Sequence, residues 1–174
     1  MPVQDTQAWF DRKFDVPYPA ALLPSVLVRL RGTPGRLEEL LRGRDRSRLV
    51  AKPDGRWSAQ EIAGHLLDVE PLWLARVGDF VSGSDRLTAA DLTNRKTEEA
   101  NHNAASLERI LTGFRAARES LSSRLEAIEP SWLTRAIPHP RLGTLMKLPD
   151  HLHFVAEHDD HHLAQIWSLL EERR

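Results

Sequence analysis

The sequence predicts an all-α fold, namely a four-helix bundle with one long crossover and a short loop or hairpin before the last helix. Three observations support this prediction. Apolar residues recur at helical period in four long stretches, which are residues 20–42, 59–81, 104–128 and 148–172. A long polar segment separates the second stretch from the third, and a segment rich in proline precedes the fourth. Each helix then has one apolar face to bury against the others.

Length and composition indicate one domain, residues 1–174. Hydrophobic residues make up 41% and charged residues 28%, and no apolar run has the length of a signal-peptide core or a membrane span. We therefore expect a cytoplasmic protein without a membrane partner. The net charge of −1 creates no field that would attract nucleic acid, so we expect no nucleic-acid partner either.

The chain contains no cysteine, which excludes disulfides, cysteine-ligated zinc and a protein thiol nucleophile. Any metal ion must therefore be held by His, Asp or Glu. The largest local charge excess lies in residues 29–48, where seven arginines stand against three acidic residues. We interpret this segment as a solvated helix face and its loop.

The first predicted helix, residues 20–42, has a helix breaker in its middle, the triplet 32–34 (Gly-Thr-Pro). Pro34 has no N–H to donate to the carbonyl of Leu30. The sequence therefore predicts either a kinked helix or two segments, the second of which Thr33 would cap.

The second predicted helix begins with a capping box formed by Ser58 and Glu61, and runs over residues 59–81. His65 lies on its inward apolar stripe. Pro71 leaves one backbone carbonyl without its helical donor, so we expect a bend just past His65.

The remaining connections are polar or rich in proline. Residues 82–101 form the long crossover, with a short helix expected after Thr88, and a helical turn is expected at residues 47–50. The third long helix covers residues 104–128. Residues 137–148 are predicted to form a loop or a short hairpin.

The fourth predicted helix holds the densest ligand chemistry, because residues 151–165 contain five of the eight histidines. His158 and His162 are one turn apart on the apolar face, so their imidazoles point the same way and can bind one metal ion. His153 and His161 lie off this stripe, and we expect them to be solvated.

His65, His158 and His162 are the predicted ligands of a divalent metal ion, because bundle cores build such sites from facing helices. Three imidazoles leave a coordination position open, as in catalytic sites, and they suit Zn, Ni, Fe or Co. The alternative is that these are core histidines that hydrogen-bond to neighbouring groups.

Two motifs in order carry a family resemblance. The segment W-S-A-Q-E-I-A-G-H-L-L-D-V-E from Trp57, followed by H-D-D-H-H-L-A-Q-I from His158, resembles the DinB/YfiT-like proteins. The resemblance implies a four-helix bundle with a divalent metal on three histidines, which map to His65, His158 and His162. Members with assigned chemistry look like metal-dependent transferases of low-molecular-weight thiols or thiol-dependent isomerases, while others look like hydrolases or stress-related proteins.

Three functions follow from such a site. The first is a metal-dependent thiol S-transferase acting on a small electrophilic molecule; because the chain has no cysteine, the thiol must be a cosubstrate. The second is a hydrolase with a metal-bound hydroxide and Asp68, Glu70, Asp159 or Asp160 as general base, although spacing selects none of these and all four could be solvated. The third is a metal-binding module without catalysis.

Two further residues are candidates for catalysis. Gln165 follows His162 by three residues and could orient it or simply be a polar helix residue, and His151 could reach the mouth of the site as an acid or base. His151 could equally be a histidine near the helix N-terminus that hydrogen-bonds to a loop. We assign no role to His102 and His139.

Finally, the apolar residues Trp167, Leu169 and Leu170 near the end of the last helix exceed what one bundle face needs, so we expect a homodimer.

Overall fold

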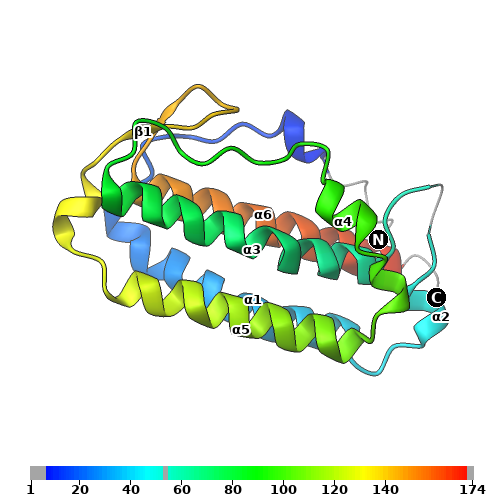
Figure 1. Cartoon of the computed structure of the whole chain (residues 1–174). Helices are drawn as coiled ribbons and strands as arrows, with labels where there is room; N and C mark the ends of the chain where they lie inside the picture. Colours follow the sequence, from blue (N-terminus) through cyan, green and yellow to red (C-terminus); the bar gives the residue numbers. More distant parts are fainter. Residues whose placement is uncertain (1–6, 53–54, 172–174) are drawn as a thin grey trace.

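The computed structural model describes residues 7–52 and 55–171, and it confirms the four-helix bundle (Figure 1). The long helices are α1 (Leu23–Leu41), α3 (Ala59–Ser82), α5 (Leu107–Glu126) and α6 (Leu148–Glu171). Helix α1 packs against α5 and α6, and α3 packs against the same two helices. Helices α1 and α3 therefore lie diagonally across the bundle. The predicted last residue of the fourth helix, Glu172, lies outside the described residues.

Short elements occupy the connections. They are η1 (Trp9–Asp11), η2 (Ala20–Leu22), α2 (Arg46–Leu49), α4 (Arg95–Glu99), η3 (His102–Ala104), η4 (Pro130–Leu133), β1 (Ile137–Pro138) and β2 (Leu145–Met146). Strands β1 and β2 pair antiparallel, with Ile137 opposite Met146. The segment before α6 is thus a hairpin, and the expected turn near residue 47 is α2.

Helix α1 is continuous through Pro34, so the predicted division into two segments is wrong. The carbonyl of Leu30, which Pro34 leaves without a helical donor, accepts a hydrogen bond from Nη1 of Arg118 at 3.0 Å. Thr33 does not cap a new helix. Its hydroxyl lies within hydrogen-bond distance of two acceptors instead, Oδ2 of Asp159 at 2.9 Å and the carbonyl of Arg29 at 3.1 Å. A side chain from α5 therefore compensates for the missing bond.

Helices α3 and α5 each begin at a residue whose side chain caps the helix. The predicted capping box is present at α3, where Ser58 accepts from the N–H of Glu61 and the Glu61 carboxylate accepts from the N–H of Ser58. Helix α5 begins at Leu107 rather than at residue 104, because Ser106 caps it by accepting from the N–H of Arg109.

A buried ion cluster joins the four helices. Arg118 of α5 donates to Glu70 of α3 through Nη2 at 2.6 Å and to Asp159 of α6 through Nη1 at 2.5 Å. Thr33 of α1 donates to Asp159 at 2.9 Å. Glu70, Arg118 and Asp159 are each at most 2% exposed. The expectation that Glu70 and Asp159 could be solvated is therefore wrong.

The arginine-rich segment is more organised than a solvated face. Arg29 and Arg36 of α1 both pair with Asp160 of α6, and Arg42 pairs with Glu108 of α5. These arginines tie α1 to its neighbours across the bundle surface.

Of the three apolar residues behind the dimer prediction, only Trp167 is exposed, at 48%. Leu170 is buried and Leu169 packs against the core. Among the described residues, no helix has both the length and the apolar content needed to cross a membrane.

Candidate metal centre and cavity

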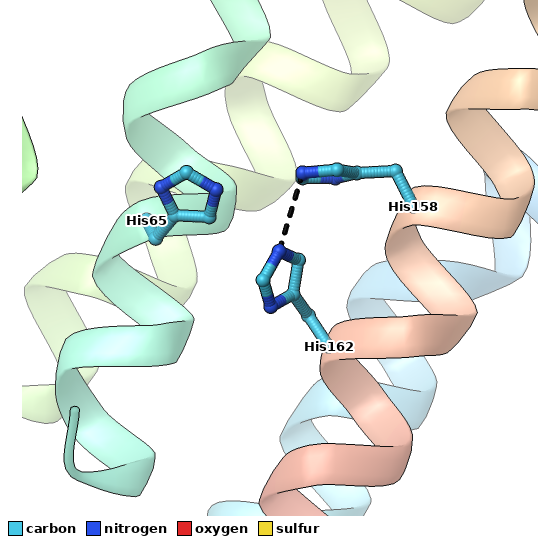
Figure 2. A group of neighbouring side chains, drawn as sticks. All are labelled: His65, His158 and His162. Atoms are coloured by element: carbon cyan, nitrogen blue, oxygen red, sulfur yellow. Dashed lines mark hydrogen bonds between the residues drawn. The ribbon is translucent and has the colours of Figure 1, made fainter. Parts of the chain in front are cut away.

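His65, His158 and His162 face one another between α3 and α6 (Figure 2). His65 comes from α3, while His158 and His162 come from successive turns of α6. One ring nitrogen of each lies within 4.8 Å of the other two. The Nε2 atoms of His158 and His162 are 3.2 Å apart, and all three side chains are buried. The structure thus brings together the three residues that the sequence selects as ligands.

A hydrogen-bond chain orients His65. Its Nδ1 lies 3.2 Å from Oγ1 of Thr97, and that hydroxyl donates to Oδ2 of Asp68 at 3.0 Å. Because the Thr97 proton goes to Asp68, the hydroxyl accepts from His65. This keeps the His65 proton on Nδ1 and leaves the lone pair of Nε2 for a ligand.

His102 completes this chain, although the sequence analysis assigns it no role. Its Nε2 lies 2.7 Å from Oδ2 of Asp68. The approach depends on Gly64, since a Cβ atom there would lie 2.2 Å from the His102 ring. The glycine beside His65 therefore makes room for the histidine that holds Asp68, a contact that no sequence spacing reveals.

His162 is oriented from within its own helix. Its Nδ1 lies 2.8 Å from Oε1 of Gln165, and an amide oxygen can only accept, so the His162 proton is on Nδ1. The lone pair of its Nε2 then faces Nε2 of His158. Nδ1 of His158 is buried with no hydrogen-bond partner among the described residues.

Burial keeps the three rings neutral. It lowers the pKa of His65 to about 4, against the attraction of Asp68 and with a smaller contribution from His102. It also places the pKa values of His158 and His162 well below the ordinary range, with the neighbouring imidazoles adding to the effect. At neutral pH the lone pairs are therefore available, which is the form that binds metal ions.

A cavity of about 650 Å³ adjoins the three histidines. Residues of α3 and α6 line one side of the cavity. The segment before α1, the crossover and the hairpin line the other side, and Figure 1 shows these three segments passing over the same face of the bundle. Its wall is rich in tryptophan: the Trp57 ring lies 4.8 Å from that of His65, and the rings of Trp9 and Trp73 lie 5.0 and 5.3 Å from that of His158. Such a cavity suits an organic molecule with an apolar body.

Another part of the cavity wall is cationic. Arg76 and Arg141 both line it, as does His139. Nε of Arg76 donates to the carbonyl of Thr88 at 2.8 Å, and Nη1 lies 3.1 Å from Nε2 of His139. Sequence reasoning selects neither arginine and assigns His139 no role, because the three residues come together only when the hairpin packs over α3.

The other three histidines of α6 lie in three different environments. His161 lines the cavity and is 6% exposed, so the expectation that it is solvated is wrong. His153 is half-buried, with its ring stacked on Tyr18 at 4.1 Å. His151 is fully buried between Trp73 and Phe80 and does not line the cavity, and neither of its ring nitrogens has a hydrogen-bond partner among residues 7–52 and 55–171.

The four carboxylates considered as general bases also differ in their surroundings. Glu70 and Asp159 are bound to Arg118, and Asp160 is paired with surface arginines of α1. Asp68 alone of the four lines the cavity.

Fold and site together define an all-α bundle with a histidine cluster at the wall of an aromatic cavity. The model of the DinB superfamily matches residues 29–166, and the chain belongs to that superfamily. The resemblance stated from the two motifs is thus confirmed. A search of curated proteins found no match.

The solved structures that resemble the chain include the following two. YfiT from Bacillus subtilis, described as a probable metal-dependent hydrolase with an unusual four-helix bundle topology, has a TM-score of 0.81 and 18% identity over 93% of both chains. A mycothiol-dependent maleylpyruvate isomerase has a TM-score of 0.63 and 11% identity over 79% of this chain and 57% of its own. The chain therefore spans just over half of the isomerase. At these identities the likeness concerns the fold.

Proposed function

We propose that the protein is a metal-dependent enzyme that transfers a low-molecular-weight thiol to a small electrophilic substrate. His65, His158 and His162 would hold a divalent ion, for which Zn, Ni, Fe and Co are the candidates. Bound there, such an ion would lower the pKa of a thiol that reaches it and so supply a nucleophile at neutral pH.

The observation behind this proposal is the combination of the histidine cluster with the cavity. Three buried, neutral imidazoles converge where two of them have acceptors for their Nδ1 protons. The cavity beside them has room for both a thiol and an electrophile, whereas the chain has no cysteine of its own. The isomerase of similar fold is described as mycothiol-dependent, which supports a thiol cosubstrate.

The chain's own residues have defined tasks in this proposal. Thr97 and Gln165 hold the rings of His65 and His162 with Nε2 turned inward, so Gln165 is a positioning residue. Trp9, Trp57 and Trp73 keep water away from the reacting atoms and contact the apolar part of the substrate.

The test is a titration of the cobalt-substituted protein with a panel of cellular thiols. We expect a sulfur-to-metal charge-transfer band. With an aryl halide as electrophile, we expect formation of the thioether as the carbon–halogen bond breaks, with release of the halide and of the thiol proton to solvent. The His158→Ala variant should show neither, whereas His153→Ala, a change on the same helix outside the cluster, should show both. Absence of any spectral change, together with thiol-independent cleavage of esters or amides, would refute the transferase.

Hydrolysis is the second candidate, because Asp68 is a carboxylate on the cavity wall and YfiT is described as a probable hydrolase. If Asp68 is a general base, Asp68→Asn should lower turnover by about 10²–10⁴-fold. Asp91→Asn, a change at another cavity residue, is the control. Thiol transfer predicts that Asp68→Asn keeps most of its activity under saturating metal.

We also propose that the protein is a homodimer formed through the exposed surface around Trp167. Light scattering at micromolar concentration should give twice the monomer mass, and Trp167→Glu should give the monomer mass. A monomer in the unmodified protein would refute the proposal.

A further inference from the structure

Two guanidinium groups on the cavity wall have no acidic partner among the described residues. Arg76 is 1% exposed, and within the described ranges its side chain has hydrogen-bond contacts with a backbone carbonyl and with His139 alone. Nη2 of Arg141 is buried and has no hydrogen-bond partner within the described part of the chain. Because a buried cation is costly without an anion beside it, this arrangement calls for an anionic group.

The acid with the strongest influence on Arg76, Asp79, is engaged elsewhere. Its carboxylate accepts from the N–H and the hydroxyl of Thr88, at 2.6 and 2.8 Å. Burial lowers the pKa of Arg76 to about 10, Asp79 opposes this shift and Arg141 adds to it, so the group is still cationic at neutral pH.

The ring of His139 also lacks a hydrogen-bond acceptor among the described residues. Its Nδ1 accepts from the backbone N–H groups of Arg141 and Leu142, at 3.3 and 3.2 Å. The ring proton is then on Nε2, where it faces Nη1 of Arg76, which is also only a donor. The other tautomer moves the conflict to Nδ1, where the proton would face two backbone donors. An oxygen atom that accepts from both Nε2 of His139 and Nη1 of Arg76 removes the conflict.

The balance of charge and shape favours a carboxylate. Burial, with Arg76 and Arg141 nearby, lowers the pKa of His139 to about 4, so the ring is neutral at pH 7. Asp79 acts on Arg76, so Asp79 and the two guanidinium groups together leave a formal excess of about one positive charge, which one carboxylate matches and a phosphate dianion exceeds. A guanidinium fork also fits the two oxygens of a carboxylate.

The cationic wall and the histidine cluster are connected through one side chain. The Trp73 ring lies 5.3 Å from that of His158 and 5.5 Å from Cζ of Arg76. A molecule lying along Trp73 can therefore reach both, with a polar group at each end.

We propose that Arg76, Arg141 and His139 form a subsite for a carboxylate group of the substrate, whose apolar body lies along Trp73 and whose reacting atom lies at the three histidines. The role of this carboxylate in the substrate rests on the proposed function. The anion binding itself does not, because the subsite uses none of the three histidines.

The test compares three probes by calorimetry on the full-length protein, first without metal and then with zinc. The probes are 4-phenylbutanoate, its neutral amide and 3-phenylpropylphosphonate. We expect the carboxylate to bind at least about tenfold more tightly than the amide, and no less tightly than the phosphonate. Arg141→Gln, at a half-buried position, should weaken carboxylate binding at least about tenfold, and so should Arg76→Gln. Arg109→Gln, at an exposed position on α5, should leave it unchanged.

Equal binding of carboxylate and amide, or unchanged carboxylate binding in Arg141→Gln, would overturn the subsite. Tighter binding of the phosphonate would overturn its assignment to a carboxylate. Arginine-dependent carboxylate binding in a protein that takes up no metal would support the subsite and refute the proposed function. Metal and thiol binding without carboxylate binding would overturn the subsite alone.

Discussion

Two buried polar clusters meet at consecutive residues of α6, since Asp159 belongs to one and His158 to the other. Around Asp159, Arg118 donates to two carboxylates and to the Leu30 carbonyl, so all three charged side chains are hydrogen-bonded within the chain. Around His158, Nε2 lies 3.2 Å from Nε2 of His162, whereas Nδ1 of His158 is buried without a hydrogen-bond partner among the described residues.

From this difference we infer that the cluster around Asp159 stabilises the fold and that the cluster around His158 binds a ligand. Buried polar groups are nearly always hydrogen-bonded, so groups that lack partners in the free protein indicate a missing one. Arg118 and its carboxylates complete one another and join the four helices. By contrast, Nδ1 of His158 and Nη2 of Arg141 are buried without hydrogen-bond partners among the described residues, which supports the proposed ligand sites.

The largest expected effect concerns the completed cluster. Arg118→Met should lower the free energy of unfolding by about 3–5 kcal/mol, because it leaves Glu70 and Asp159 as buried, uncompensated charges. Urea denaturation measures this loss. The control is Arg115→Met, also on α5, which breaks a surface pair with Glu38 of α1 and should cost less than about 1 kcal/mol. Equal losses in the two variants would contradict the structural role of Arg118.

Metal binding to the histidine cluster should stabilise the folded protein. Zinc at a hundredfold excess over its dissociation constant should raise the free energy of unfolding by about 2.7 kcal/mol, and a chelator should reverse this. In His158→Ala the increment should vanish, whereas His153→Ala should retain it. If the metal-free His158→Ala protein loses as much stability as Arg118→Met does, the two clusters do not differ as described.

A smaller effect is expected from the groups that orient the ligands. Thr97→Val removes the acceptor for Nδ1 of His65 and should weaken metal affinity by about 10–100-fold, without unfolding the protein. Competition with a chromogenic chelator measures the affinity. Thr112→Val, at an exposed position on α5, is the control. Unchanged affinity in Thr97→Val would show that the chain to Asp68 does not support the site.

The smallest effect concerns His139, beside Arg76, and the dependence of stability on pH. His139 is neutral in the folded protein down to its pKa of about 4, whereas in the unfolded chain it takes up a proton near pH 6.5. The unfolded state therefore binds more protons between these values, so stability falls as the pH is lowered through this window. The slope for one such group is at most about 1.4 kcal/mol per pH unit, and less where solvent screens the ring. In metal-free protein His139→Gln should have a shallower slope than the unmodified chain, and an unchanged slope would contradict the assignment.

Much of the fold could be predicted because helical period and caps are local. The capping box at Ser58 and the inward position of His65 follow from a few neighbouring residues. The continuity of α1 could not be predicted, since the donor that replaces the N–H missing at Pro34 comes from Arg118, far along the chain. For the same reason, the contacts of Asp68 with His102 and of Arg76 with His139 could not be predicted. They form only when the crossover and the hairpin pack over α3.

The most direct test of the central claim is X-ray absorption spectroscopy of the zinc-loaded protein. The account predicts one zinc ion per chain with three imidazole nitrogens at about 2.0–2.1 Å, and loss of this signal in His65→Ala. A zinc environment made of oxygen atoms alone, or an imidazole signal that persists unchanged in His65→Ala, would contradict it.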